Sequence, residues 1–289
     1  MGEQISVETS QNTELQDEPQ MIEKRESHII VVTSGKGGVG KTTSTSNIAV
    51  ALAKLGKKVV AVDADIGLRN LDVIMGLENR VVYNFVDVLE GNCRLSQALV
   101  RDKRVDTLYL LPAAQTRTKD AVNNEQMIRL CDMLREEFDY ILLDCPAGIE
   151  GGFRNAAIGA DEAIIVVTPE VPSVRDADRI IGMLESMGKS PIRLIVNRIR
   201  PDMVRGGDML DVPDILEILA VSLVGVVPED DSVIKAANRG EPMAFANKSP
   251  AAKAYMNIAE RIIGNDVPFT NLDTKPRGLI ENIKKILGI

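Results

Sequence analysis

Short runs of apolar, mostly β-branched residues alternate along the chain with stretches in which apolar residues recur every three or four positions. Continuous apolar runs are typical of strands buried on both faces of a parallel sheet, and the longer period is typical of helices that cover such a sheet. We therefore expect an α/β fold with a mainly parallel, doubly wound sheet and helices on both faces. The expected strands are 29–33, 59–63, 107–111, 140–144, 163–168, 192–197 and 223–227, and the expected helices include 42–55, 125–137, 174–187 and 212–219.

The same pattern divides the chain into four parts. Residues 1–27 are polar, carry seven acids and show little periodicity, which predicts a disordered acidic leader. Residues 28–266 hold all the expected strands, without an internal repeat, and are expected to form one domain. Residues 267–276 are expected to be a linker, and residues 277–289 return to a helical period.

This last segment is amphipathic. Five aliphatic residues fall on one helical face, and two lysines lie among the polar residues of the other: Leu279, Ile280, Ile283, Ile286 and Leu287 against Lys284 and Lys285. We expect these seven residues to contact a membrane, with the helix lying in the interface. A helix this short is marginal in water, so we expect it to fold on lipid. The alternative is an ordinary C-terminal helix that packs on the domain.

Composition narrows the class of protein. Hydrophobic residues make up 45% of the chain and charged residues 26%, which is ordinary for a globular protein. The net charge of −8 argues against a surface that coats nucleic acid. Three cysteines without CxxC spacing suggest neither disulfides nor a zinc or iron–sulfur site. The cysteines are instead expected to be small buried residues of a reduced, cytosolic protein. No apolar stretch is long enough to span a membrane. With the amphipathic segment, we expect a cytoplasmic protein that is peripheral on the inner face of the cell membrane.

The chemistry begins directly after the first expected strand. The sequence TSGKGGVGKTT satisfies the phosphate-loop spacing, in which glycines turn backbone N–H groups toward one anion at a helix N-terminus. We expect Lys41 to reach the β- and γ-phosphates of a nucleotide and the Thr42 hydroxyl to bind Mg²⁺. The expected contacts are Gly35, Lys36, Gly37, Gly38, Val39, Gly40, Lys41, Thr42 and Thr43.

Acids follow two other strands, and in a parallel sheet such strand ends share one edge with the glycine loop. Asp65 lies just beyond the second strand and is our candidate for orienting the attacking water and for a place near Mg²⁺, whereas Asp63 is expected to be structural. Asp144 ends an apolar strand and is expected to touch Mg²⁺ through a coordinated water. Gly148, in the turn after Asp144, is a candidate for sensing the γ-phosphate.

The residues that would recognise the base are less sharply marked. Asn197 ends a strand and is a candidate for a hydrogen bond to the adenine edge. Pro228 and Asp230 follow the last strand and are candidates for closing over the ring. Each of these residues is also an ordinary choice for a strand end or turn.

Together these motifs resemble the MinD cell-division ATPases, within the ParA/MinD group of deviant Walker A ATPases. The resemblance rests on KGGVGKT, DADIGLRNLDVIMGLE, DCPAGIE and PEVPSVRDADRI, and it covers residues 29–263 and the C-terminal segment. It implies a P-loop NTPase fold of the SIMIBI type and hydrolysis of ATP with Mg²⁺. It also implies that Lys36 is the signature lysine, which reaches the nucleotide of the partner subunit in an ATP-bound homodimer, and that Lys36, Lys41 and Asp65 carry catalysis. The acidic leader departs from the family pattern, as does Cys145, where serine is common.

The same resemblance implies partners. These are an anionic membrane surface, a MinC-like inhibitor of septum formation and a MinE-like activator of hydrolysis, with partner contacts on the helix of Arg175, Asp176 and Asp178. From the residues alone that stretch is a solvated helix face. The alternatives are a ParA-like DNA-partition ATPase, a MinD-like regulator of flagellar number and an iron–sulfur carrier on the same scaffold.

Overall fold

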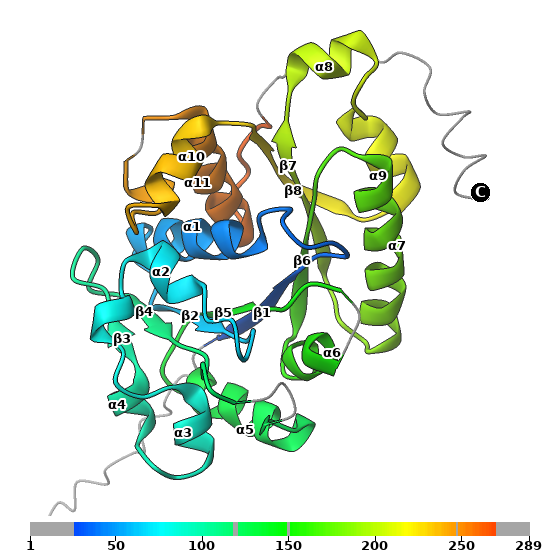
Figure 1. The fold of residues 1–289 in the computed structure, drawn as a ribbon. Coiled ribbons are helices and arrows are strands. Elements are labelled where there is room, and N and C mark those ends of the chain that lie inside the picture. The colour runs from blue at the N-terminus through cyan, green and yellow to red at the C-terminus, as the bar shows by residue number, and fades with distance from the viewer. Residues whose placement is uncertain (1–25, 118–120, 149–150, 247, 270–289) are drawn as a thin grey trace, which may run out of the picture.

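Eight strands form one sheet in the computed structural model, in the order β3-β4-β2-β5-β1-β6-β7-β8 (Figure 1). The structure describes residues 26–117, 121–148, 151–246 and 248–269. Every neighbouring pair is parallel except the antiparallel pair β3–β4. The strands are β1 (His28–Thr33), β2 (Val59–Asp63), β3 (Val100–Arg101), β4 (Leu108–Leu111), β5 (Tyr140–Asp144), β6 (Glu162–Val167), β7 (Ile192–Ile199) and β8 (Ser222–Pro228).

Helices cover both faces of the sheet, and each face has its own apolar core (Figure 1). One core lies under α1 (Lys41–Lys54), α2 (Leu71–Met75), α10 (Asp231–Ala237), the 3₁₀ turn η3 (Met243–Phe245) and α11 (Pro250–Ile262). The other lies under α3 (Phe85–Leu89), α4 (Leu95–Ala98), α5 (Asn124–Arg135), α6 (Gly151–Ile158), α7 (Val171–Ser186) and α9 (Val212–Leu219). The short elements η1 (Glu78–Arg80) and α8 (Pro201–Gly206) complete the described chain.

The predicted fold class is confirmed, and all seven predicted strands are present within one or two residues of their expected ends. The strand that sequence analysis missed is β3, which has only two residues and pairs antiparallel at the edge of the sheet. Helix α7 begins three residues earlier than predicted, because Pro172 suits the first turn of a helix. Helix α11 was not among the helices that we named.

The end of α11 is tied to the chain that follows it. The Arg261 guanidinium donates to the carbonyls of Val267 and Pro268 and to that of Val224 in β8, at 2.9 to 3.0 Å. It also lies over the Phe269 ring, 3.9 Å from the ring centroid. The predicted helix 277–289 lies outside the described residues, as does nearly all of the leader. Among the described helices, none has both the length and the apolar character needed to span a membrane.

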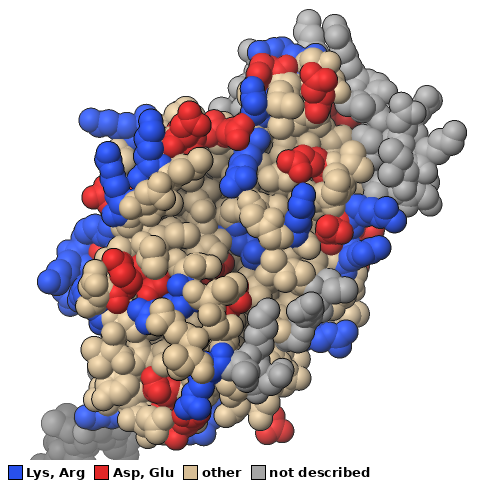
Figure 2. All heavy atoms as spheres, viewed as in Figure 1, with Lys and Arg blue, Asp and Glu red and all other residues tan. Residues whose placement is uncertain are grey.

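The surface carries both signs of charge. On the face seen in Figure 2, acidic residues lie among the Lys and Arg residues, so neither sign covers that face alone. A mixed surface of this kind accords with the net charge of −8.

Candidate functional site

The glycine loop lies at the carboxyl end of β1, between that strand and the N-terminus of α1. Gly38 and Gly40 have φ values of 77° and 99°, in the left-handed region where glycine is favoured. Lys36, Gly37 and Gly38 are exposed, whereas Val39 is buried and anchors the far side of the loop. The backbone N–H groups at the start of α1 therefore face a position that an anion can occupy.

Two close approaches explain further glycines in the loop. A Cβ atom on Gly35 would lie 2.4 Å from the backbone of Asp176 in α7, and one on Gly40 would lie 2.4 Å from Nδ2 of Asn197. The Asn197 amide donates to the Val39 carbonyl at 2.7 Å. The phosphate loop is thus held between α7 on one side and the end of β7 on the other.

Lys36 projects from the exposed part of the loop. Its Nζ lies 3.9 Å from a carboxylate oxygen of Glu170, and the two side chains are 49% and 56% exposed. An ion pair at that separation and exposure contributes little free energy. The Lys36 side chain is therefore able to turn away from Glu170 at small cost.

Asp144 lies at the buried end of β5, and only 2% of the residue is exposed. Its Oδ1 accepts a hydrogen bond of 3.1 Å from Thr45, and the Thr42 hydroxyl and Lys41 also lie close to the carboxylate. Burial and the neighbouring Asp63 raise the pKa of Asp144 to about 7. A buried carboxylate beside the Thr42 hydroxyl is the oxygen donor set that suits a hydrated Mg²⁺ ion.

Asp63 is opposite Asp144 on the neighbouring strand, in the same register. Its carboxylate accepts three backbone hydrogen bonds of 3.1 Å, from Asp65, Asn70 and Leu71. Burial raises the pKa of Asp63 to about 6, although these hydrogen bonds oppose the shift. Asp63 therefore shapes the turn that carries Asp65 and begins α2, in line with the expected structural role.

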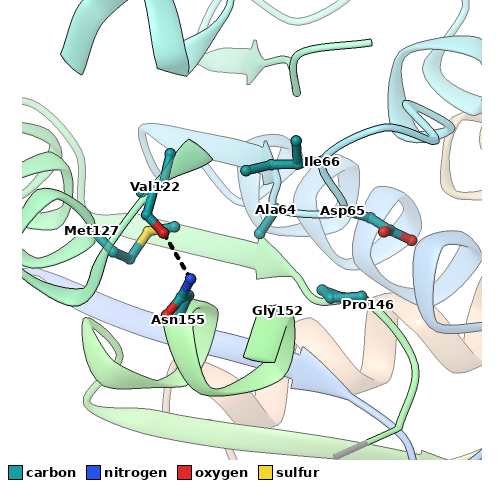
Figure 3. Close-up of a pocket in the computed structure, with 8 residues that line it drawn as sticks. All are labelled: Ala64, Asp65, Ile66, Val122, Met127, Pro146, Gly152 and Asn155. Atoms are coloured by element: carbon teal, nitrogen blue, oxygen red, sulfur yellow. Dashed lines mark hydrogen bonds between the residues drawn. The ribbon is translucent and has the colours of Figure 1, made fainter. Parts of the chain in front are cut away.

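The backbone around Asp65 is fixed from both neighbouring strands. Ala64 donates to the carbonyl of Asp144, and Gly67 donates to the carbonyl of Ala114, each at 2.9 Å. A small cavity of about 10 Å³ lies behind this turn, with Pro146 and helices α5 and α6 on its other sides. In Figure 3 the Asp65 side chain points away from Asn155 and Met127.

The turn after Asp144 is also tied to the phosphate loop. Gly148, with a φ of 88°, donates from its backbone N–H to the Ser34 carbonyl at 3.2 Å. The buried Cys145 thiol has a raised pKa because it is removed from water, so it is held as an unreactive thiol. Residues 149–150 lie outside the described chain.

A pocket of about 140 Å³ adjoins the far side of the phosphate loop. All three residues predicted to contact the base line it: Asn197, Pro228 and Asp230. Asp230 Oδ1, however, accepts a 2.9 Å hydrogen bond from the backbone N–H of Ser232 and so caps α10. Asp230 is thus already engaged by its own helix, and Asn197 by Val39.

Sequence reasoning missed several residues of this region. Arg198 lines the pocket with a positive φ of 59°, which is unusual for a residue with a side chain. The fully buried Tyr255 reaches the pocket from α11, with its hydroxyl 3.4 Å from that of Ser44 in α1. Glu170, Thr45 and Asn155 were also missed. Glu170 lies within the motif PEVPSVRDADRI but was not singled out in it, and Thr45 and Asn155 lie outside the quoted motifs.

Comparison with known proteins places this geometry in a family. Residues 30–243 match the CobQ/CobB/MinD/ParA nucleotide-binding domain. The chain belongs to that family. It is 55% identical over 262 residues to the septum site-determining protein MinD of Bacillus subtilis, a match that covers 90% of this chain and 98% of that protein.

Two solved MinD structures are similar over most of their length. The MinC:MinD cell division protein complex of Aquifex aeolicus superposes with a TM-score of 0.80 at 51% identity, covering 85% of this chain and 99% of that chain. MinD from Pyrococcus horikoshii, solved with Mg-ADP, superposes with a TM-score of 0.74 at 31% identity, covering 82% of this chain and 96% of that chain.

The chain is therefore a nucleotide-binding ATPase of the MinD septum-site-determining group, and the resemblance inferred from its motifs is confirmed. The predicted binding of ATP and Mg²⁺ fits the MinD phosphate loop and the Thr42–Asp144 donor set described above. Among the described residues no cluster of three or more His, Cys, Asp or Glu is arranged around a metal ion. A MinD site that holds Mg²⁺ with few protein ligands, nucleotide phosphates and waters needs no such cluster.

Proposed function

We propose that this MinD-type ATPase forms a homodimer with ATP, binds the inner face of the cell membrane through residues 277–289 and recruits a MinC-like inhibitor there. A MinE-like activator would stimulate hydrolysis and release the protein. The 51% identical chain solved in the MinC:MinD complex supports the MinC-like partner. The exposed and weakly paired Lys36 carries the dimer step, because it is able to turn toward a second subunit without a large loss.

Within the site, we assign each residue a role. The backbone of residues 35–43 would hold the phosphates, and Lys41 would offset their charge. Thr42 and Asp144 would hold Mg²⁺, which shields the phosphate charge during hydrolysis. Asp65 would orient the attacking water, and the Gly148 N–H would turn from the Ser34 carbonyl toward the γ-phosphate.

Helix α7 supports an activator contact close to the phosphate loop. Arg175 and Asp178 are exposed on α7, and Asp176 touches Gly35 through its backbone. Because Asp176 borders Gly35, a partner that binds this charged stretch would lie next to the loop that is proposed to hold the phosphates. The pocket beside Asn197 is the proposed adenine site.

The free energies of burying and ordering the C-terminal segment explain why dimerisation would control membrane binding. Burying five aliphatic side chains at roughly 1.5 to 3 kcal/mol each is largely offset by ordering about eleven residues at roughly 1 to 2 kcal/mol each. A single segment therefore binds weakly. Two segments on one dimer raise the avidity by roughly 10² to 10⁴, so control of dimerisation is control of membrane residence.

Sedimentation with vesicles of anionic phospholipid tests the proposal. The full chain should pellet with ATP and not with ADP, and neither Lys41→Ala nor a chain ending after Phe269 should pellet in either nucleotide. Lys253→Ala is the matched control, since Lys253 is exposed on α11 away from the loop. Pelleting of the shortened chain with ATP would contradict the role of the tail. Retention on DNA with ATP, without binding to vesicles, would favour the DNA-partition alternative.

A further inference from the structure

Helix α6 follows the turn of residues 145–148, named the γ-phosphate turn after the role proposed for Gly148. The helix is braced at one point by a side chain that no motif predicts. Asn155, in α6, donates from Nδ2 to the backbone carbonyl of Val122 at 2.8 Å, as Figure 3 shows. Val122 is 2% exposed, so this carbonyl is largely removed from water. Loss of the donor would leave a buried acceptor without its partner, which costs about 1 to 3 kcal/mol.

Helix α6 is in turn packed against the γ-phosphate turn. A Cβ atom on Gly152 would lie 2.8 Å from Cγ of Pro146, so the first turn of α6 sits directly on the proline ring. Pro146 is two residues after Asp144 and two residues before Gly148. A shift of α6 would therefore move the turn that carries Gly148, the proposed γ-phosphate contact.

The same helix closes the space behind Asp65. The cavity of about 10 Å³ is lined by the turn 64–66, by Pro146, by Gly152 and Asn155 of α6, and by Val122 and Met127 beside α5. A volume of that size corresponds to about one water molecule, so the four segments are nearly in contact. The separation between the Asp65 turn and the Pro146 turn thus depends on how α6 is held.

We infer that Asn155 is a positioning residue for ATP hydrolysis: its hydrogen bond to Val122 fixes α6 and, through Gly152 and Pro146, the spacing between the Asp65 turn and the γ-phosphate turn. The side-chain hydrogen bond of Asn155 goes to Val122, and Asn155 is not among the residues that line the pocket beside Asn197. It should therefore affect the chemical step and not the binding of nucleotide. The inference rests on the role proposed above for Asp65 in orienting water.

The test compares two variants of the full chain with a matched control. Asn155→Leu removes the donor, and Asn155→Asp keeps the shape but replaces the donor with an acceptor. Thr107→Val is the control, because the Thr107 hydroxyl also donates to a backbone carbonyl, that of Ala53, at 3.2 Å and far from the strand ends that carry the site. Measurements are kcat and KM for ATP hydrolysis, the melting temperature and the affinity for a fluorescent ADP analogue.

We expect kcat of both Asn155 variants to fall about 10-fold, within the roughly 10²-fold that a 1 Å misplacement costs. KM and ADP affinity should stay within about two-fold of wild type, because the variants leave the residues that contact the nucleotide unchanged. Thr107→Val should lower the melting temperature by a similar amount without this loss of kcat. Relative to wild type at each pH, Asn155→Asp should recover as the pH falls from about 6 toward about 4, near the ordinary pKa of an Asp carboxyl, because a protonated carboxyl donates again, and Asn155→Leu should not.

An Asn155→Leu enzyme with wild-type kcat would overturn the inference, as would an equal loss of kcat in Thr107→Val at equal melting temperature. Asp65→Asn separates this outcome from failure of the proposed site. If Asp65→Asn hydrolyses ATP like wild type, the role of Asp65 is wrong whatever Asn155 does. If Asp65→Asn is inactive and Asn155→Leu is normal, only the positioning role fails.

Discussion

The two ends of the nucleotide site are built in different ways. At the phosphate end, one stretch of nine residues supplies the loop, and its neighbours Asp144, Thr45 and Asp176 hold or border it. At the base end, the pocket is bordered by Gly40 and Thr43 of the loop, and the rest of its lining comes from β7, β8, α10 and α11, which are distant from the loop in sequence. Its two most polar predicted contacts also have structural tasks, since Asn197 holds Val39 and Asp230 caps α10.

If the proposed assignment holds, phosphate recognition depends on a local backbone conformation, whereas base recognition is shared among residues that also maintain the fold. A substitution at the phosphate end should change binding strongly with little change in stability. A substitution at the base end should change stability as well. The predictions below use this contrast, beginning with the largest effect.

Lys41→Ala should weaken the binding of ATP by at least roughly 100-fold, because it removes the cation that is expected to offset the charge of the β- and γ-phosphates. The melting temperature without nucleotide should hardly change. Titration of a fluorescent ATP analogue and a thermal melt measure the two quantities. Comparable binding by Lys41→Ala and wild type would break the phosphate-end assignment.

Asp144→Asn should lower the affinity for Mg²⁺ in the presence of ADP by roughly 10- to 100-fold, as expected for a ligand that acts through a coordinated water. Isothermal titration with Mg²⁺ checks this. Because binding requires the carboxylate, the wild-type affinity for Mg²⁺ should also fall as the pH drops below about 7. The affinity of the Asn variant should depend less on pH.

The same variant should alter the pH dependence of stability in the nucleotide-free protein. The pKa of Asp144 is raised in the folded state, so its contribution to stability is present below its usual value of 3.8 and is lost as the pH rises through about 7. The stability of Asp144→Asn does not decrease in this way, because its amide does not titrate. Its melting temperature relative to wild type should therefore rise between acidic and mildly alkaline pH, and a constant difference would contradict the pKa shift.

Asn197→Ala should weaken ATP binding about 10-fold, because loss of a buried hydrogen bond costs about 1 to 3 kcal/mol. If Asn197 acts mainly through Val39, the affinities for ATP, GTP and tripolyphosphate should fall by the same factor. If it reads the adenine edge, only ATP should be weakened and the preference for ATP over GTP should shrink. Competition binding with the three ligands sharpens the contrast between the two ends.

Asp230→Ala should have the smallest effect on nucleotide and a clear effect on the fold. Loss of a helix N-cap costs about 1 kcal/mol, which corresponds to roughly 2 to 4 °C in melting temperature for a domain of this size. ATP affinity should change by no more than about two-fold if capping α10 is its main task. A large loss of affinity at unchanged melting temperature would instead make Asp230 a direct contact.

The sequence predicted the features that depend on neighbouring residues. Continuous apolar strands predicted the parallel sheet, and the order of the strand ends predicted that Asp144 lies beside Lys41 and Thr42 of the phosphate loop. Strand β3 was not predicted, because two residues are too few to show an alternation of apolar and polar positions. Three contacts were not predicted, because each joins segments that only the folded chain brings together. They are the hydrogen bond of Asn197 to Val39, the contact of Gly35 with Asp176 and the hydrogen bond of Asn155 to Val122.

The cluster around Arg261 has a mechanical consequence. A pull on the chain beyond Phe269 would load two hydrogen bonds and a ring contact at once, all of which join residues 267–269 to Arg261. A third hydrogen bond joins Arg261 itself to Val224 in β8. Hydrogen bonds loaded side by side share the force, so this junction resists peeling better than any one of them alone. Tension would then pass through Arg261 into α11 and, through Val224, into β8 of the sheet.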